Sequence, residues 1–386
     1  MIRLFALIFY LCCILSCKSQ TPAGIIKGAD QINEVTAKLK GKKVALVVNH
    51  TALVGKTHLA DTLQSLGINI VRIFGPEHGF RGDAADGEHV NDSLDAKTKI
   101  PVVSLYGKNR KPTPRQLADI DVVVFDIQDV GARFYTYIGT LHYIMESCAE
   151  NNKSLIVLDR PNPNSYVDGP ILQPEFKSFV GMHPVPITHG LTVGEFATMI
   201  NGEGWLEGKK ECDLEIIKLK NWTHADEYSL PVKPSPNLPN DQAVRLYPSL
   251  CLFEGTAISL GRGTTFPFLA LGNPEFKNRK GMDFQFTPVD IKGMANDPPL
   301  ENQLCYGIDL RHVQVERRVN LKYLLEFYNN YPFKDKFFIK SFDRLAGSAV
   351  LRQQIIDGLT EEQIRESWKE GLTAYNQIRK KYLLYP

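Results

Sequence analysis

The fold is decided by the segment Lys43-Val44-Ala45-Leu46-Val47-Val48-Asn49. A continuous run of aliphatic and β-branched residues is typical of a strand that is buried on both faces of a parallel sheet. Runs of the same kind follow at residues 68–74, 102–106, 122–127 and 154–158. Helical spacing is found at residues 29–39, 57–66, 114–118 and 135–151. This alternation predicts βαβ units and a parallel sheet.

The character of the chain changes near residue 165. Residues 165–300 are rich in Pro and Gly, and a strand at 306–315 and helices at 320–330 and 361–380 follow. With 386 residues, the chain is long enough for two domains. We therefore predict the α/β class, with a Rossmann-like parallel-sheet domain at 29–164. A second, smaller α+β subdomain at 165–386 is expected to close a cleft against it.

Composition excludes several classes of partner. The formal net charge is +2 and the Lys and Arg residues are scattered among acids, so nothing indicates a nucleic-acid surface. The first predicted strand is followed by Asn-His-Thr-Ala-Leu-Val-Gly, without a dinucleotide fingerprint, and no Walker A pattern occurs. We therefore expect neither a nucleotide nor any other cofactor.

The first 17 residues have the pattern of a secretory leader. Arg3 precedes an apolar run from Leu4 to Leu15, which is too short to span a bilayer. The sequence Ile14-Leu15-Ser16-Cys17 is similar to a bacterial lipobox, and a plain signal peptide is the alternative. We predict a signal peptide at 1–17, a polar tether at 18–28, and a periplasmic or cell-envelope lipoprotein that is attached to the membrane only through a lipid on Cys17.

Four cysteines remain beyond the leader, and they are far apart in sequence. None forms a CxxC pair, so their spacing does not support a zinc site. Disulfides and buried free thiols both stay open for these residues: Cys148, Cys212, Cys251 and Cys305.

Polar and ionisable residues recur where the predicted strands end. These are Asn49-His50, Glu77-His78, Tyr106, Gln128-Asp129 with Arg133, and Asp159-Arg160 with Asn162. Right-handed crossovers place the carboxyl ends of parallel strands at one edge of the sheet, where ligands bind. The sequence therefore predicts an active site at this edge.

The same loops carry long motifs. They are Phe74-Gly75-Pro76-Glu77-His78-Gly79-Phe80-Arg81-Gly82, the stretch from Phe125 to Tyr137, Leu158-Asp159-Arg160-Pro161-Asn162-Pro163-Asn164, Pro234-Ser235-Pro236-Asn237, and Leu252-Phe253-Glu254-Gly255-Thr256 with Gly261-Arg262-Gly263-Thr264-Thr265. Over nearly the whole mature chain, these motifs resemble the exo-β-N-acetylmuramidase family. The resemblance implies a glycosidase that removes N-acetylmuramic acid from the non-reducing end of peptidoglycan fragments, with the active cleft between a Rossmann-like domain and a smaller subdomain.

Glycoside hydrolysis needs an acid for the leaving oxygen and commonly a second group as base or nucleophile. Glu77 is the candidate acid, and its structural alternative is a helix cap or a partner of Arg81. Asp129 is a candidate second group, as are Tyr135 and Tyr137, because the resemblance implies a tyrosine. The two tyrosines would differ by about 200° in a helix, so one is expected to face the cleft and the other the core. Asp159 is a further candidate, with an internal salt bridge to Arg160 as its alternative.

The lactyl carboxylate of muramic acid matches the fork of an arginine. Arg133, Arg160 and Arg262 are the candidates, and at least one is expected to brace a loop instead. Further candidate sugar-binding residues are Asn49, His50, His78, Asn162, Asn164, Asn237 and Glu254, with His189 as a weaker one, whereas Glu88 and His89 are expected to be solvated. Two other classes of function stay open: a metal-dependent hydrolase using His50 and His78, although no metal-ligand spacing supports it, and a non-catalytic peptidoglycan- or sugar-binding lipoprotein.

Overall fold

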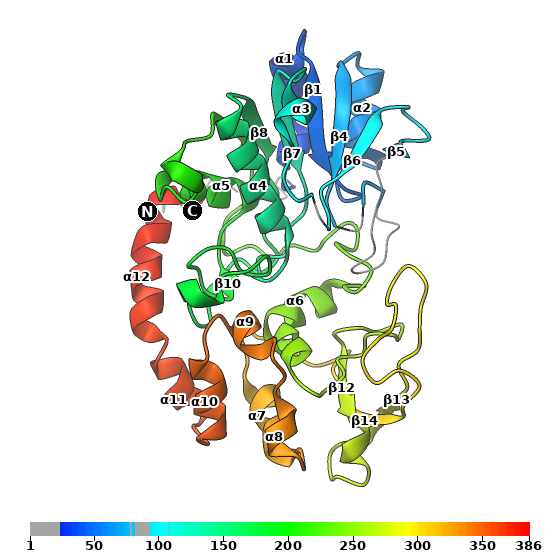
Figure 1. Cartoon of the computed structure of the whole chain (residues 1–386), viewed down its shortest axis with the longest axis vertical. Coiled ribbons are helices and arrows are strands. Elements are labelled where there is room, and N and C mark those ends of the chain that lie inside the picture. Colours follow the sequence, from blue (N-terminus) through cyan, green and yellow to red (C-terminus); the bar gives the residue numbers. More distant parts are fainter. Residues whose placement is uncertain (1–23, 78, 82–92, 108) are drawn as a thin grey trace, which may run out of the picture.

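The computed structural model describes residues 24–77, 79–81, 93–107 and 109–386. Its largest sheet has seven strands in the order β11-β8-β7-β1-β4-β6-β5 and lies in the upper part of Figure 1. Six strands are parallel: β1 (Val44–Val48), β4 (Ile70–Gly75), β6 (Pro101–Ser104), β7 (Val122–Asp126), β8 (Ser154–Leu158) and β11 (Leu214–Ile217). Only the edge strand β5 (Ser93–Leu94) is antiparallel among them. The predicted parallel sheet is confirmed.

Helices cover both faces of this sheet. Alternate residues of β1 belong to different apolar clusters, because successive side chains of a strand point to opposite faces. Ala45 and Val47 share one cluster with residues of α4 (Tyr137–Glu150) and α5 (Val193–Gly202). Val44, Leu46 and Val48 share the other with residues of α1 (Ile32–Leu39) and α2 (Leu59–Ser65). The β-branched runs are thus buried on both sides, as the sequence predicts.

The predicted elements differ from the structure mainly at their ends. The segment 57–66 starts as β3 (Thr57–His58), which pairs with β2 (Leu53–Val54), and α2 begins only at Leu59. His58 ends the strand because its side chain accepts a hydrogen bond from the amide of Ala60 and so caps α2. The helix α3 (Pro114–Leu117) lies where it is expected, with the capping box of Thr113 and Gln116 in front of it.

The boundary predicted at residue 164 is too early for the sheet. β11 pairs in parallel with β8, and α5 packs on the same sheet, yet both lie beyond that boundary. The short strand β11 has an exposed Glu215 between Leu214 and Ile216, and only Ile217 is fully buried, so it lacks the long apolar run that marks the other strands. The antiparallel pair of β9 (Val167–Asp168) and β10 (Thr188–His189) lies between β8 and α5 in the chain.

The second part of the chain combines helices with a small antiparallel sheet. The sheet order is β12-β14-β13, from β12 (Ala270–Asn273), β13 (Phe284–Phe286) and β14 (Cys305–Asp309). The helices are α6 (Asp241–Leu250), α7 (Lys322–Asn330), α8 (Lys334–Phe337), α9 (Phe342–Ala346), α10 (Val350–Ile356), α11 (Glu361–Glu366) and α12 (Lys369–Arg379). Short 3₁₀ turns are η1 (Gly28–Asp30), η2 (Pro174–Phe176), η3 (Glu207–Lys209), η4 (Cys251–Gly255), η5 (Pro274–Phe276) and η6 (Lys380–Tyr382). The strand predicted at 306–315 therefore ends at Asp309, and the helix predicted at 361–380 is divided between α11 and α12.

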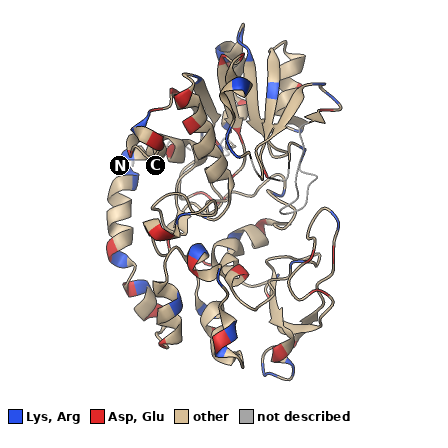
Figure 2. Cartoon of the chain, viewed as in Figure 1, with Lys and Arg blue, Asp and Glu red and all other residues tan. Residues whose placement is uncertain are grey.

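Charge and cysteine usage follow the expectations from composition. Lys and Arg are interspersed with Asp and Glu over both parts of the chain (Figure 2). Cys148, Cys212, Cys251 and Cys305 are buried free thiols. Within the described residues, no helix has the length and apolar character that a membrane crossing requires.

The C-terminal segment returns to the parallel sheet and is fixed there by Tyr385. Its hydroxyl donates to Asp159 Oδ2 at 2.6 Å and accepts from the amide of Leu219 at 2.9 Å. Burial raises the pKa of Asp159 to about 6, and the hydrogen bond from Tyr385 acts in the opposite direction. Asp159 therefore serves as an internal anchor, but the expected salt bridge to Arg160 is wrong, because the Arg160 guanidinium pairs with Asp126.

We expect Tyr385→Phe to lower the free energy of unfolding by about 1.5–3 kcal/mol, the usual loss for a hydrogen bond to a charged group. The loss should be larger at pH 8 than at pH 5, because only the ionised Asp159 carboxylate depends on this donor. Urea denaturation at both pH values measures it. The matched control is Tyr382→Phe, whose hydroxyl donates to the more exposed Glu203. Equal losses for the two variants would contradict the anchoring role of Tyr385.

Candidate active site

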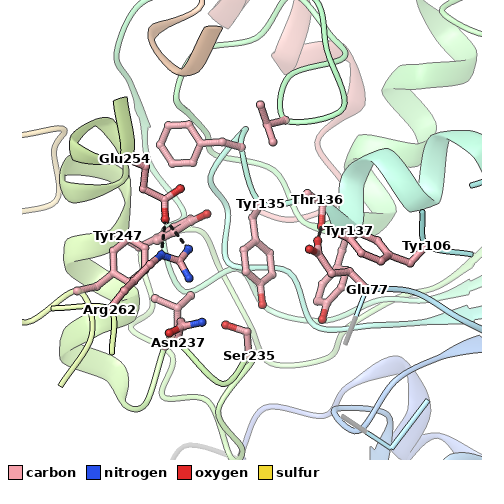
Figure 3. Close-up of a pocket in the computed structure, with 14 residues that line it drawn as sticks. Glu77, Tyr106, Tyr135, Thr136, Tyr137, Ser235, Asn237, Tyr247, Glu254 and Arg262 are labelled. Atoms are coloured by element: carbon pink, nitrogen blue, oxygen red, sulfur yellow. Dashed lines mark hydrogen bonds and ion pairs between the residues drawn. The ribbon is translucent and has the colours of Figure 1, made fainter. Parts of the chain in front are cut away.

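A cavity of about 310 Å³ lies at the carboxyl ends of the parallel strands, where the second part of the chain faces the sheet (Figure 3). Its volume is at the lower end of the range for small-molecule sites. The lining residues come from loops far apart in sequence: Glu77, Tyr106, Phe134, Tyr135, Thr136, Tyr137, Val180, Ser235, Asn237, Leu238, Tyr247, Glu254, Arg262 and Phe268. This active-site cavity thus brings together the strand-end loops and the Pro-rich 234–240 loop.

Glu77 projects into the cavity from the loop after β4. One carboxyl oxygen, Oε2, accepts a hydrogen bond from Thr136 Oγ1 at 2.7 Å. Arg81, the structural partner considered for Glu77, instead pairs with Asp95 at 2.9 Å and Asp61 at 3.3 Å. Glu77 is therefore held in the cavity by the hydroxyl of Thr136 and not by Arg81.

Tyr135 and Tyr137 both line the cavity, so the expectation that one faces the core is wrong. The reason is the start of α4: Tyr137 is its first residue, Thr136 is its N-cap, and Tyr135 precedes the helix, so helical geometry does not relate the two rings. The rings meet edge to face with centroids 4.9 Å apart. Burial raises the pKa of both phenols, and the charge of Asp129 raises both further. Each phenol is thus neutral until a neighbour takes its proton.

Asp129 is buried and does not line the cavity. Its Oδ2 accepts from the amide of Gly131 at 2.6 Å, and His189 Nε2 is 3.8 Å from the same oxygen. Gly131 has a φ of 77°, which favours glycine, so the Asp-Val-Gly segment forms a tight turn. The other oxygen, Oδ1, is buried without a hydrogen-bond partner among the described residues. Asp129 therefore stabilises a turn through Oδ2, while Oδ1 remains available as a hydrogen-bond acceptor.

Two of the three candidate arginines brace the fold, which corrects their assignment to substrate binding. The buried guanidinium of Arg133 donates to the carbonyls of Pro170, Val185, Leu345 and Ala346. Arg160 uses its fork on Asp126, with Nε and Nη2 at 2.5 and 2.9 Å from the two carboxylate oxygens. Only Arg262 among the three lines the cavity, and its Nε and Nη2 donate to Glu254 Oε1.

Two candidate asparagines also have structural roles, again contrary to their assignment to the substrate. Asn162 donates to the carbonyl of Leu191 and accepts from the amide of Asn164. Asn164 donates to the carbonyls of Val130 and Val244. Both are buried, and neither lines the cavity. A strand-end position specifies the edge of the sheet but not the direction of a side chain, so the sequence pattern did not reveal these roles.

The other candidates are divided between the cavity and its surroundings. Asn237 lines the cavity and donates to the carbonyl of Met294, while its Oδ1 has no hydrogen-bond partner within the described part of the chain. Asn49 is buried next to Tyr137, and its contribution opposes the rise that burial causes in the pKa of that phenol. His50 lies outside the lining, with Nε2 2.8 Å from the carbonyl of Lys233. His78, Glu88 and His89 fall outside the described residues.

Several lining residues were not predicted. Ser235 lies in a Pro-rich motif, and the rigidity of that motif could have indicated a site residue. Thr136 lies between the two candidate tyrosines, so its position could have indicated it. Tyr247 belongs to an amphipathic helix, where an aromatic residue is read as core, so no sequence signal distinguishes it. Among the described residues, Glu146, Glu150 and Glu207 lie close enough together to share a metal ion, but none lines the cavity and Lys111 pairs with the first two.

Comparison with known proteins agrees with this architecture. Residues 44–242 match the N-terminal domain of exo-beta-N-acetylmuramidase NamZ, and residues 245–385 match its C-terminal domain. Peptidoglycan beta-N-acetylmuramidase NamZ of Bacillus subtilis (strain 168) is 40% identical over 377 residues, which cover 90% of this chain and 88% of that protein.

Two solved structures of DUF1343 family proteins from Bacteroides fragilis NCTC 9343 have the same fold. BF0379 is 44% identical with a TM-score of 0.87, and BF0371 is 31% identical with a TM-score of 0.79. Each comparison covers 94% of this chain and 99% of the other. Together, the cavity at the strand ends and the two domain matches along nearly the whole chain show that this protein belongs to the exo-beta-N-acetylmuramidase NamZ family.

Proposed function

We propose that this chain is an exo-acting glycoside hydrolase that releases N-acetylmuramic acid from the non-reducing end of peptidoglycan fragments during cell-wall turnover or recycling. The observation that carries the proposal is a cavity of about 310 Å³ that places Glu77 and two tyrosines together, in a chain 40% identical to a peptidoglycan beta-N-acetylmuramidase. Incubation with the disaccharide N-acetylmuramyl-N-acetylglucosamine should release free N-acetylmuramic acid. The rate should be unchanged by a chelator, which separates this reaction from metal-dependent hydrolysis.

Glu77 is the proposed general acid. A leaving sugar oxygen needs a proton as its bond to the anomeric carbon breaks, and a positioned carboxyl group supplies it. Thr136 holds Oε2, which leaves Oε1 to reach the leaving oxygen. The loss of the proton from Glu77 prepares the same group to act as base in the second half of the reaction.

Tyr135 is the proposed nucleophile. It lies between Glu77 and the Glu254–Arg262 pair, where a bound sugar ring would sit (Figure 3). It is 8% exposed against 2% for Tyr137, which lies beside Glu77 on the side of the acid (Figure 3). A nucleophile has to approach the anomeric carbon from the face opposite the leaving group, so the tyrosine away from the acid fits better.

The proposed reaction has two steps. The Tyr135 oxygen bonds to the anomeric carbon, its proton passes to the carboxylate of Asp129, whose charge acts on this phenol, and the departing oxygen takes the proton of Glu77. Water then bonds to the anomeric carbon and gives a proton to Glu77, while the Tyr135 oxygen leaves and recovers its proton from Asp129. The product sugar therefore retains its anomeric configuration.

Arg262 is the proposed reader of the lactyl carboxylate. We expect Arg262→Met to reduce kcat/KM for muramyl substrates about 10- to 150-fold, because a charge-assisted hydrogen bond contributes about 1.5–3 kcal/mol. A substrate with N-acetylglucosamine in place of muramic acid lacks the carboxylate, so its kcat/KM should change little in this variant. Matched aryl glycosides of the two sugars measure the difference. A parallel loss on both substrates together with a lower melting temperature would make Arg262 a brace like Arg133.

Export and lipid attachment are proposed as well. The lipobox-like Ile14-Leu15-Ser16-Cys17 and the apolar leader support cleavage before Cys17 and a lipid on its thiol. Residues 1–23 lie outside the described part of the chain. Mass spectrometry of the protein from a bacterial envelope should find the mature N-terminus at residue 17 with the mass of a diacylglyceryl group. Another N-terminus, or an unmodified Cys17, would reject the anchor.

A further inference from the structure

A second cavity adjoins the active-site cavity. It has a volume of about 350 Å³ and is lined mainly by apolar side chains such as Ile258, Leu260 and Pro298. Of the described lining residues, only Glu254 and Arg262 belong to both cavities. Their ion pair therefore lies at the boundary between two spaces of similar size.

The pair is held in place from both sides. Arg262 stands between Gly261 and Gly263, with φ values of 78° and 77°, a conformation that fixes a tight turn and favours glycine. A Cβ on Gly263 would lie 2.5 Å from Pro298, so this turn is packed against the second cavity. Glu254 precedes Gly255, where a Cβ would lie 2.4 Å from Phe342. Neither residue can move its backbone away from the boundary without disturbing its neighbours.

The pair and the acid are at opposite ends of the active-site cavity. In Figure 3, Glu77 lies on one side of Tyr135, and Glu254 and Arg262 lie on the other. A sugar whose anomeric carbon faces Glu77 and Tyr135 directs the opposite side of its ring, which carries the 4-hydroxyl, toward the pair. In a β-1,4-linked glycan, the next sugar toward the non-reducing end is attached at that hydroxyl.

We infer that the Glu254–Arg262 ion pair is the barrier that restricts this site to the terminal sugar, and that the second cavity is the space a further sugar would occupy without it. The inference rests on the proposed function and assigns its exo specificity to two side chains. Removal of the barrier should convert part of the activity to cleavage inside a glycan chain.

The test uses the trisaccharide N-acetylglucosaminyl-N-acetylmuramyl-N-acetylglucosamine, in which the muramic acid is no longer terminal. Wild-type protein should leave it intact. Glu254→Ala/Arg262→Ala should hydrolyse its muramyl bond at least tenfold faster than wild type, with release of N-acetylglucosaminyl-N-acetylmuramic acid. Glu254→Gln alone, which keeps the bulk of the barrier and leaves Arg262 in place, should leave this substrate intact. The matched control Asp343→Ala/Arg352→Ala removes an ion pair that lines neither cavity, and it should also leave the trisaccharide intact.

A binding measurement covers the case in which the double alanine variant turns over no substrate. In the Glu77→Gln background, calorimetry should detect trisaccharide binding only when Glu254 and Arg262 are both alanine. Adding Ile258→Trp, which fills the second cavity, should abolish that binding. Absence of both binding and cleavage in a folded double alanine variant would overturn the inference. If wild-type protein released no muramic acid from the disaccharide, the proposed function would fail instead.

Discussion

Replacement of Glu77 by Gln should reduce kcat on N-acetylmuramyl-N-acetylglucosamine about 10²- to 10⁴-fold, the usual contribution of a general acid. Glutamine has the same shape and can still accept the hydrogen bond from Thr136, so the loop after β4 should keep its position. It cannot donate a proton to the leaving oxygen. Steady-state kinetics with unchanged circular dichroism and melting temperature measures the effect.

The leaving group makes this prediction specific. The nitrophenolate of a nitrophenyl muramide departs without much help from an acid, so Glu77→Gln should slow the first step, the release of nitrophenol, far less than it slows the first step on the disaccharide. A structural role for Glu77 would affect both substrates equally. Retention of one third of the wild-type rate on the disaccharide would show that Glu77 is not the acid.

Tyr135→Phe should lower kcat by about 10³-fold or more, because removal of a nucleophile commonly costs more than removal of any other single catalytic group. Tyr137→Phe serves as the matched control: it removes a hydroxyl from the same aromatic pair, with ring centroids 4.9 Å apart, and should cost less than about tenfold. Quenching of wild-type protein with a slowly hydrolysed fluorinated muramide should leave a sugar on Tyr135. The opposite order of the two losses, or a sugar found on Tyr137, would transfer the role to Tyr137.

The fold could be predicted from sequence because its signal is local. The runs that form β1, β4, β6, β7 and β8 are apolar since both faces of the sheet are covered, and burial on both faces leaves a continuous pattern. The strand β11 escapes this rule because it is a short edge strand that exposes Glu215 and fully buries only Ile217. Its pairing with β8 depends on contacts between residues far apart in sequence, so the boundary at residue 164 could not be corrected from the pattern alone.

The candidate site shows the same division. Strand-end positions predicted the edge of the sheet at which the cavity lies, and six of the candidate residues line it: Glu77, Tyr135, Tyr137, Asn237, Glu254 and Arg262. Arg133, Arg160, Asn162 and Asn164 share those loops but point into the protein, where they satisfy backbone carbonyls or the buried carboxylate of Asp126. Buried carbonyls and carboxylates need such partners as much as a substrate does, so residue type and loop position do not separate the two roles.

The most direct test of the central claim compares two disaccharides that differ only in the non-reducing sugar. Wild-type protein is incubated with N-acetylmuramyl-N-acetylglucosamine and, separately, with N,N′-diacetylchitobiose, and the released monosaccharides are quantified by mass spectrometry. Our account predicts free N-acetylmuramic acid from the first substrate and, for the second, a rate at least about tenfold lower, as expected for loss of the lactyl carboxylate. Equal turnover of the two disaccharides, or no release from the muramyl substrate, would contradict it.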